Sequence, residues 1–175
     1  LGDNLPKGGI KDFAESFMNS NHDAMILLCE VASPQRFGVA KFNADRKLVG
    51  LVEKPKEPPS KYALTGIYFF KPIIFEMIKK LKPSWRGELE ITDAIQLLLE
   101  SGYDVGHRFV KGWWKDNGTP QDIIEANRLV LDDLRPEIKG TVEDINSIQG
   151  RVSIGENTTI KEGALIRGPT IIGES

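Results

Sequence analysis

The end of the chain carries aliphatic residues at every sixth position, a period that fits neither an amphipathic helix nor an alternating strand. The series is Val142, Ile148, Ile154, Ile160, Ile166 and Ile172, and the positions four residues later are small or β-branched (Asn146, Val152, Thr158, Ala164 and Thr170). This pattern is typical of a parallel β-helix, in which each hexapeptide forms one flat side and its aliphatic residue points inward. We expect residues 137–175 to begin a left-handed parallel β-helix, which needs further coils or a cap to bury its end.

Ahead of this tail, predicted strands and helices alternate, as in an α/β domain. Apolar runs predict strands at 24–31 and 62–70, a hairpin of 37–42 with 48–53, and a further strand around 105–109. Helical spacing predicts helices at 10–18, from Pro72 to Leu81, at 92–100 and at 119–134. The last would have Thr119 as its cap, Pro120 in its first turn and Asp122 near the positive end of its dipole. We expect the α/β domain to span residues 1–136 and to end near Arg135-Pro136.

Composition excludes several classes of function. The formal charge is −2 and the pI is about 5.8, whereas a dedicated nucleic-acid or membrane-surface binder shows a basic excess. The single cysteine, Cys29, lies in an apolar run and is expected to be a small core residue. It gives no disulfide framework, so we expect a reducing, cytoplasmic setting. No apolar run approaches the length of a membrane span.

Glu53 and Lys54 stand side by side where the apolar strand 48–53 ends. Leu48, Val49, Leu51 and Val52 would be apolar on both faces, which predicts a buried strand in a sheet covered on both sides. A carboxylate there can accept hydroxyl protons and an ammonium can meet a phosphate, at the strand ends where α/β sheets bind ligands. The alternative is a solvated turn, since a charged and Pro-rich stretch follows at 56–60.

Two further carboxylates come from distant segments. Asp3 follows what could be the last residue of a strand, and Asp116 lies between a predicted strand and a helix start. Two strand-end carboxylates suit Mg²⁺, whose remaining ligands would be water and substrate phosphates. Taken alone, Asp3 is better explained as a loop acid near the start of the chain, and Asp116 also fits an acid in a Gly-containing turn.

Several motifs, in order along almost the whole chain, resemble the sugar-1-phosphate nucleotidylyltransferases. They are Phe37-Gly38-Val39, Val52-Glu53-Lys54-Pro55, Leu64-Thr65-Gly66-Ile67-Tyr68, Arg86-Gly87-Glu88-Leu89-Glu90-Ile91-Thr92-Asp93 and Trp114-Lys115-Asp116-Asn117-Gly118-Thr119. The resemblance is strongest to the glucose-1-phosphate thymidylyltransferases of the long form, which carry a hexapeptide-repeat tail. It implies a Rossmann-like nucleotidyltransferase domain with a mixed sheet, of which this chain carries the C-terminal portion.

The resemblance also implies a reaction between dTTP and glucose 1-phosphate, in which pyrophosphate leaves. Asp3 and Asp116 would hold Mg²⁺, Lys54 would contact the sugar phosphate, and Glu53 would accept hydrogen bonds from sugar hydroxyls. Gly38 would let the backbone approach the sugar, and Leu64, Gly66, Tyr68 and Trp114 would line that pocket. The acids of 86–90 are expected to be structural, capping the following helix or holding their loop. The enzyme is expected to be a homo-oligomer.

The family's Gly-rich nucleotide-binding loop lies upstream of Leu1-Gly2-Asp3-Asn4, so base preference cannot be read from these residues. The chain begins without Met and stops at Ser175 in mid-pattern, so we expect a segment of a longer protein that is inactive by itself. Asn117 occupies the position at which the short-form members of this family more often carry Thr. The alternatives are a UTP-dependent uridylyltransferase and a hexapeptide-repeat acyltransferase or assembly module. An acyltransferase needs a histidine base near the repeat, and both histidines, His22 and His107, lie outside it.

Overall fold

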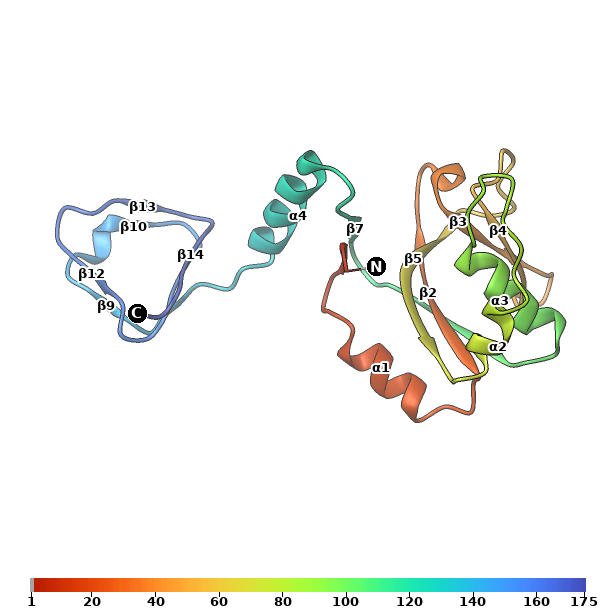
Figure 1. Ribbon diagram of the computed structural model, residues 1–175. Coiled ribbons are helices and arrows are strands. Elements are labelled where there is room, and N and C mark those ends of the chain that lie inside the picture. The colour runs from red at the N-terminus through yellow and green to blue at the C-terminus, as the bar shows by residue number, and fades with distance from the viewer. Residues whose placement is uncertain (1) are drawn as a thin grey trace. The chain divides into compact units, whose positions relative to one another are not determined.

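The structure is a computed structural model that describes residues 2–175 (Figure 1). Its contacts divide the chain into two compact units, Leu1–Asp116 and Asn117–Ser175. This division falls ahead of the predicted end of the α/β domain at residue 136, because the last long helix groups with the second unit. The boundary at 136 stays a prediction. Within residues 2–175, no helix is both long and apolar enough to cross a lipid bilayer.

The first unit holds most of the regular structure. Its elements are β1 (Asn4–Pro6), α1 (Lys11–Met18), β2 (Ala24–Glu30), the 3₁₀ turn η1 (Pro34–Arg36), β3 (Gly38–Phe42), β4 (Leu48–Glu53), β5 (Tyr62–Phe70), α2 (Ile74–Ile78), α3 (Ile91–Glu100), β6 (Val105–Phe109) and β7 (Trp114–Asp116).

A five-stranded mixed sheet in the order β4-β3-β5-β2-β6 organises this unit. The β2–β6 pair is parallel and the other pairs are antiparallel, which confirms the predicted α/β class with a mixed sheet. The predicted hairpin of β3 with β4 is also confirmed, with Gly38 opposite Glu53. A separate two-stranded sheet pairs β1 with β7.

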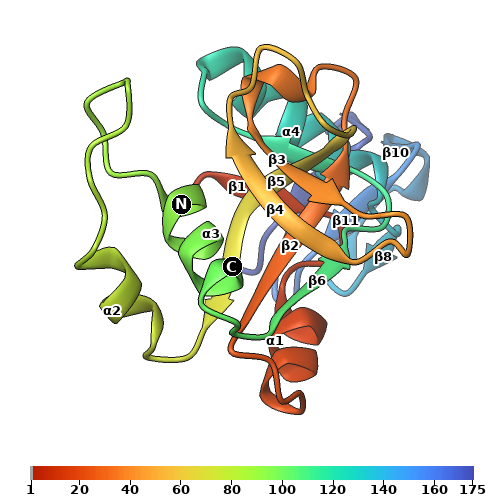
Figure 2. The same cartoon turned by 90° about the vertical axis from the view of Figure 1, so that its right-hand side faces the viewer.

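Strand β2 is buried on both faces because its apolar residues alternate between two cores. Ala24, Ile26 and Leu28 pack in the core shared with α2 and α3, whereas Met25 and Leu27 pack against residues of α1. Figure 2 shows α1 on one side of the sheet and α2 with α3 on the other. Cys29, predicted to be a core residue, is a buried free thiol.

Two expectations about the first unit are wrong. β4 is an edge strand rather than a strand covered on both faces, and Val49 and Val52 are 43% and 42% exposed. The apolar pattern of a strand gives no information on its neighbours, so strand order could not be read from it. The helix predicted from Pro72 to Leu81 is only Ile74–Ile78, because Lys80 and Leu81 bond to the carbonyls of Met77 and Ile78, three residues back, rather than continuing the α-helical pattern.

The second unit begins with a helix and continues as short parallel strands. Its elements are α4 (Pro120–Asp132), β8 (Glu137–Ile138), β9 (Thr141–Val142), the 3₁₀ turn η2 (Ile145–Ser147), β10 (Ile148–Gln149), β11 (Val152–Ile154), β12 (Thr159–Ile160), β13 (Ile166–Arg167) and β14 (Thr170–Ile172).

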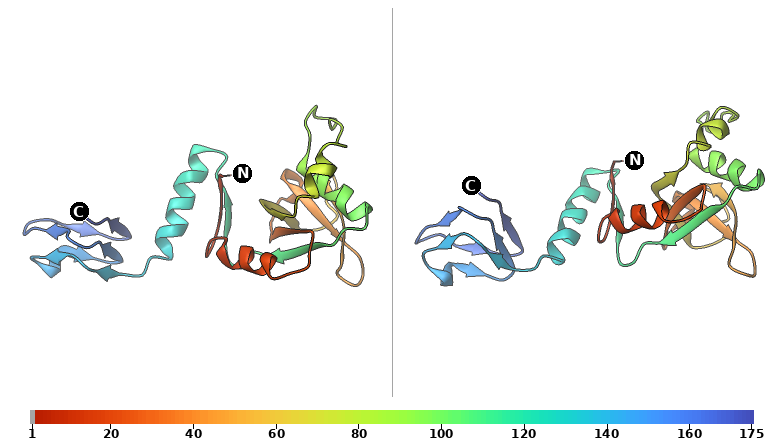
Figure 3. Two further views of the ribbon diagram at one scale, coloured as in Figure 1. Left: turned by 60° about the horizontal axis from the view of Figure 1, so that its bottom comes forward. Right: turned by 90° about the horizontal axis from the view of Figure 1, so that it is seen from below.

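Helix α4 starts as the sequence predicts. The Thr119 hydroxyl accepts from the Asp122 backbone N–H, the Asp122 carboxylate accepts from the Thr119 N–H, and Pro120 occupies the first turn. Beyond the helix, Ile148 pairs with Ile166 and Thr159 with Thr141, so strands three six-residue periods apart lie side by side. Figure 3 shows these strands stacked in layers. Val152 and Ile154 are buried.

Candidate active site

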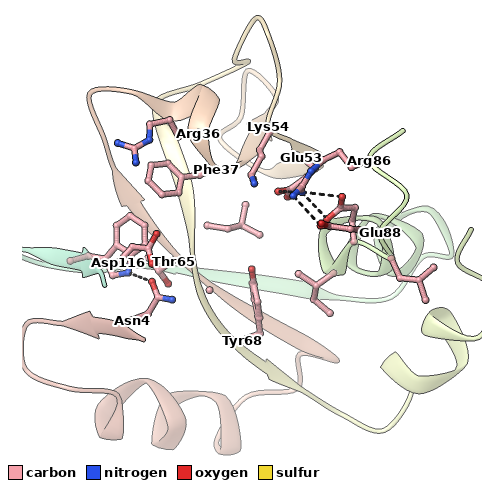
Figure 4. A pocket seen from close by; sticks show the side chains of 17 residues that line it. Asn4, Arg36, Phe37, Glu53, Lys54, Thr65, Tyr68, Arg86, Glu88 and Asp116 are labelled. Carbon is pink, nitrogen blue, oxygen red and sulfur yellow. Dashed lines mark hydrogen bonds and ion pairs between the residues drawn. The ribbon is translucent and has the colours of Figure 1, made fainter. Parts of the chain in front are cut away.

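The first unit contains a cavity of about 920 Å³ where β3, β4 and β5 meet the β1–β7 pair (Figure 4). Most of the predicted site residues line this cavity, namely Gly38, Glu53, Lys54, Leu64, Gly66, Tyr68, Trp114 and Asp116. Asp3 is exposed and is not among the lining residues. The lining also includes residues without a predicted role in binding, which are Asn4, Arg36, Phe37, Thr65, Arg86, Glu88, Leu89, Glu90 and Ile91.

The β1–β7 pair brings the start of the chain to Asp116. Asn4 lies opposite Asp116, and the Trp114 indole N–H donates to Asn4 Oδ1 at 3.0 Å. The Asn4 amide also donates to Asp3 Oδ1 at 3.0 Å. The strand end expected at Leu1 lies outside the described residues, and β1 instead begins directly after Asp3. Asp116 is the last residue of β7.

The two carboxylates near this strand pair are of the donor type that Mg²⁺ prefers. Among residues 2–175 there is no group of three or more His, Cys, Asp or Glu side chains placed to hold a metal. Mg²⁺ is usually bound by one or two carboxylates and completes its octahedron with water and substrate phosphates. Asp116 lines the cavity, whereas Asp3 precedes β1 and neighbours Asn4, the residue opposite Asp116, so Asp3 and Asp116 as the two metal ligands stay a prediction.

Glu53 is held by helix α3. The Thr92 hydroxyl donates to Glu53 Oε2 at 2.7 Å, and Arg86 Nη1 lies 3.8 Å from Glu53 Oε1. A Cβ atom on Gly38 would lie 2.8 Å from Thr92 Cγ2 and 3.0 Å from Glu53 Oε2. The missing side chain at Gly38 therefore makes room for Glu53 and Thr92, in addition to the predicted approach of a ligand.

Arg86 is shared by three carboxylates, as the dashed lines in Figure 4 show. Its guanidinium lies 3.0 Å from Glu88, 3.2 Å from Glu90 and 3.8 Å from Glu53. The Glu90 side chain is only 9% exposed and also accepts from the Ser84 hydroxyl at 2.9 Å. Glu90 makes no side-chain hydrogen bond that caps α3, so of the two structural roles expected for these acids the ion pairs with Arg86 support holding the loop.

Lys54 follows directly after β4 with an unusual backbone conformation. Its φ is 40°, in the left-handed region, while its N–H still donates to the Phe37 carbonyl at 3.1 Å. In Figure 4 its ammonium points toward the cavity. Arg36, whose guanidinium lies over the Phe37 ring at 5.8 Å, lines the same cavity. Arg36 was missed by the sequence reasoning, because nothing in the sequence places the short turn η1 beside Lys54.

Gly66 has a structural role inside β5. Between the pairs Ile26–Tyr68 and Leu28–Leu64 the register of β2 and β5 shifts, and Gly66 has a φ of 75° at this bulge. A bulge with a left-handed glycine re-aims neighbouring side chains. The buried Thr65 hydroxyl is satisfied by donating to the Leu27 carbonyl at 3.1 Å. The glycine thus bends the strand where β5 borders the cavity.

Two aromatic residues form walls of the cavity. The Tyr68 hydroxyl points into it (Figure 4). Burial, followed by the charge of Glu53, raises the pKa of Tyr68 well above its ordinary value, so the phenol stays neutral and can donate a hydrogen bond. On another side, Trp114 packs edge-on against Phe37, with ring centroids 5.3 Å apart.

Charge is divided across the cavity. Arg36 and Lys54 offer cations on one side, while Glu53 offers a carboxylate held in place by Thr92 and Arg86. Cations suit phosphate oxygens, and an ionised carboxylate accepts hydrogen bonds from hydroxyl groups. The arrangement is chemically suited to a ligand with a phosphate at one end and hydroxyl groups at the other.

Residues 1–133 match the family model described as nucleotidyl transferase. The low-salt glycan biosynthesis nucleotidyltransferase Agl11 of Haloferax volcanii is 50% identical over 90% of this chain and 44% of its own length. A glucose-1-phosphate thymidylyltransferase of Streptomyces antibioticus is 47% identical over 99% of this chain and 49% of its own length. The chain thus spans about half the length of the curated relatives that it matches.

Solved structures show the same fold. A Bacillus anthracis protein assigned as a glucose-1-phosphate thymidylyltransferase, in complex with a sucrose, has a TM-score of 0.66 and 44% identity, covering 78% of this chain and 55% of that chain. A UDP-glucose pyrophosphorylase complexed with UDP-glucose has a TM-score of 0.66 and 25% identity, covering 75% of this chain and 54% of that chain. The sequence match over residues 1–133 establishes that the chain belongs to the nucleotidyl transferase family.

Proposed function

We propose that the protein containing this chain transfers a nucleotidyl group from dTTP to glucose 1-phosphate, giving dTDP-glucose and pyrophosphate. The observation that carries the proposal is that Glu53, Lys54 and Asp116 surround one cavity in a chain of this family. The thymidylyltransferases among the relatives support the choice of base and sugar. The chain by itself is proposed to be inactive.

The reaction needs positioning and charge neutralisation rather than a covalent enzyme intermediate. A sugar-phosphate oxygen forms a bond to the α-phosphorus of the triphosphate, and the bond to the bridging oxygen of the leaving pyrophosphate breaks. Lys54 holds the attacking phosphate in line, with Arg36 on the same side of the cavity. An ammonium and a phosphate in contact attract each other by about 4 kcal/mol at an effective dielectric constant of about 20.

Glu53 and Tyr68 recognise the sugar by hydrogen bonds. The Glu53 carboxylate accepts hydrogen bonds from sugar hydroxyls, and the neutral Tyr68 phenol has a hydrogen to donate toward the same cavity. Leu64, Trp114 and the backbone at Gly38 and Gly66 give this end its shape. Mg²⁺ bound by Asp3 and Asp116 would neutralise charge on the triphosphate and its leaving group.

The second unit is proposed to be the beginning of a left-handed parallel β-helix of hexapeptide repeats. The parallel pairs Ile148–Ile166, Val152–Thr170 and Thr159–Thr141 support it, as does the partial burial of the sixth-residue aliphatics. We assign this unit to assembly of a homo-oligomer rather than to chemistry. The buried free thiol of Cys29 supports a reducing, cytoplasmic setting.

A UTP-dependent uridylyltransferase is the second candidate, favoured by the similarity to the UDP-glucose pyrophosphorylase complexed with UDP-glucose. The hexapeptide-repeat acyltransferase is less well supported, because His22 and His107 both belong to the first unit and neither belongs to the repeat sequence.

A pyrophosphate-release assay on the complete protein tests the proposal. Each nucleoside triphosphate is offered with each of several sugar 1-phosphates, with and without Mg²⁺. The expected result is fastest release with dTTP and glucose 1-phosphate, and none without Mg²⁺. Preference for UTP would favour the second candidate. Turnover of acetyl-CoA without pyrophosphate release would overturn the assignment.

A further inference from the structure

Asn117-Gly118 is the only asparagine–glycine pair in the chain. It follows Asp116, the last residue of β7, and precedes Thr119, the cap residue of α4. Both residues of the pair lie outside helices and strands, and Gly118 is exposed. The pair therefore forms the short link between a strand that lines the cavity and the helix that follows it in the chain.

The backbone nitrogen of Gly118 is available for reaction. An asparagine side chain closes onto the nitrogen of the next residue most easily when that nitrogen is uncrowded and makes no hydrogen bond. Within residues 2–175, the Gly118 N–H donates to no other group. Glycine also has no Cβ to obstruct the approaching amide carbon. Because Gly118 is exposed, water and hydroxide can reach this nitrogen.

The side chain of Asn117 is not held by its carbonyl oxygen. Asn117 Oδ1 is buried and accepts no hydrogen bond from the described part of the chain. Most buried side-chain oxygens have a donor, which fixes the orientation of the group that carries them. Asn117 lacks this restraint, so its amide carbon can turn toward the nitrogen of Gly118 without breaking a hydrogen bond to Oδ1.

Two other asparagines, each followed by a serine, show the contrasting arrangement. The serine after Asn19 donates its N–H to the Phe17 carbonyl at 3.0 Å. The serine after Asn146 donates its N–H to the Asp144 carbonyl at 3.1 Å. The amide of Asn146 also donates to Asp144 Oδ1 at 3.0 Å. In both cases the nitrogen that would attack is already engaged, and its residue carries a Cβ.

We propose that Asn117-Gly118 is a site of spontaneous modification, at which Asn117 deamidates through a cyclic succinimide and the enzyme thereby loses activity. Hydroxide removes the proton of the Gly118 N–H, and the nitrogen forms a bond to Asn117 Cγ. The Cγ–Nδ2 bond breaks, and the side-chain nitrogen takes up a proton and leaves as ammonia. Water then adds to either ring carbonyl and opens the ring, which gives aspartate or isoaspartate. Water is the only co-reactant, and asparagine is among the heat-labile residues.

Either product changes the surroundings of Asp116, which lines the cavity. Aspartate at position 117 adds a negative charge next to this carboxylate. Isoaspartate routes the backbone through the side-chain carbon, so the link from Asp116 to the Thr119 cap becomes one carbon longer. The loss of activity rests on the proposed function, whereas the modification itself does not.

The experiment ages the complete protein at physiological temperature, at pH 6 and at pH 8, and compares the wild type with Asn117→Gln and Gly118→Ala. Peptide mass spectrometry measures deamidation and isoaspartate at each asparagine, and pyrophosphate release measures activity. Glutamine keeps the amide but would have to close a larger ring. Alanine places a Cβ beside the attacking nitrogen, and the φ of Gly118 is not positive, so alanine can adopt this backbone.

Asn117 is expected to deamidate at least about tenfold faster than Asn19 and Asn146 in the wild type, because only its neighbour is a glycine with an unengaged N–H. The reaction should be faster at pH 8 than at pH 6, since a base removes the N–H proton. Activity should fall in step with the fraction of unmodified Asn117. Both variants should keep their activity at least about tenfold longer than the wild type.

Three results would overturn the inference. Asn117 could stay intact while Asn19 or Asn146 deamidates, the fully modified wild type could keep its activity, or Asn117→Gln could lose activity as fast as the wild type. A fresh wild type that releases no pyrophosphate would count against the proposed function instead. The mass measurement would then still decide whether Asn117 deamidates first.

Discussion

Asn4 lies directly opposite Asp116 in the antiparallel pairing of β1 with β7. Two segments from opposite ends of the first unit meet there, at the edge of a cavity that also holds Glu53 and Lys54. The Trp114 indole N–H adds a hydrogen bond between the two strands by donating to Asn4 Oδ1. The candidate site thus depends on a short strand pair outside the main sheet.

Loss of the Lys54 ammonium is expected to reduce activity strongly without unfolding the protein. The φ of Lys54 is 40°, a backbone conformation that strains an alanine as much as a lysine. A glycine adopts the same conformation without strain. Lys54→Ala should therefore keep wild-type stability, and Lys54→Gly should match it within about 1 kcal/mol. Both should lower kcat/KM about 1000-fold, measured by pyrophosphate release.

Lys56→Ala is the matched control, since Lys56 is an exposed lysine just beyond the site. It should leave kcat/KM within a factor of about two, because exposed charges contribute little. Equal losses in the Lys54 and Lys56 variants would argue against a role for Lys54 in the reaction.

Gly38→Ala is expected to reduce both stability and sugar binding. The new methyl group would lie 2.8 Å from Thr92 Cγ2 and 3.0 Å from Glu53 Oε2, so one of these side chains must move. Overpacking of this kind costs about 1–3 kcal/mol in urea unfolding. Gly50→Ala, which would meet the flexible end of Gln96 at 3.2 Å, should cost clearly less. Unchanged sugar KM in Gly38→Ala would contradict the tight packing described here.

Arg86→Met is expected to destabilise the first unit by about 2–3 kcal/mol, because it leaves the buried Glu90 carboxylate without its cation. The control is Lys79→Met. Lys79 pairs with Glu76 at a shorter distance of 2.8 Å, but the two side chains are 70% and 56% exposed. The free energy of unfolding lost in Lys79→Met should stay below about 1 kcal/mol. Equal midpoints of urea unfolding for the two variants would refute the structural role of Arg86.

His107 should make stability fall in mild acid. Burial first, then the charges of His22 and Arg108, lower the pKa of His107 below its ordinary value of 6.5. The unfolded chain therefore takes up a proton near pH 6.5 that the folded protein resists. The free energy of unfolding should be independent of this group above about pH 7.5 and should decrease as pH falls through 6.5.

His107→Phe should remove that acid-dependent component while keeping ring contacts with Phe42 and Phe109, now 5.2 and 5.4 Å from the imidazole. The measurement is urea unfolding between pH 5 and 8. An identical pH dependence in wild type and variant would assign the acid loss to other groups.

Local patterns in the sequence predicted the elements well. The β3–β4 hairpin, the strand β5 and the capping of α4 by Thr119 follow from alternation, turn residues and cap chemistry over a few positions. The residues around the cavity could be named because their motifs resemble a family, and not because their spacing brings them together.

Features that depend on non-local pairing could not be predicted. The edge position of β4 depends on which strands lie beside it, and the β1–β7 pair joins segments that carry no shared pattern. The contact of Arg86 with three acids and the bond from Thr92 to Glu53 likewise require the position of α3 against the sheet. Arg36 reaches the cavity through a turn without a distinctive sequence.

A crystal structure of the complete enzyme with its nucleotide-sugar product and Mg²⁺ tests the central claim most directly. The account predicts that sugar hydroxyls bond Glu53, that Lys54 Nζ contacts the phosphate nearest the sugar, and that Asp3 and Asp116 both ligate the metal. A product bound outside this cavity, or a metal held without Asp116, would contradict it.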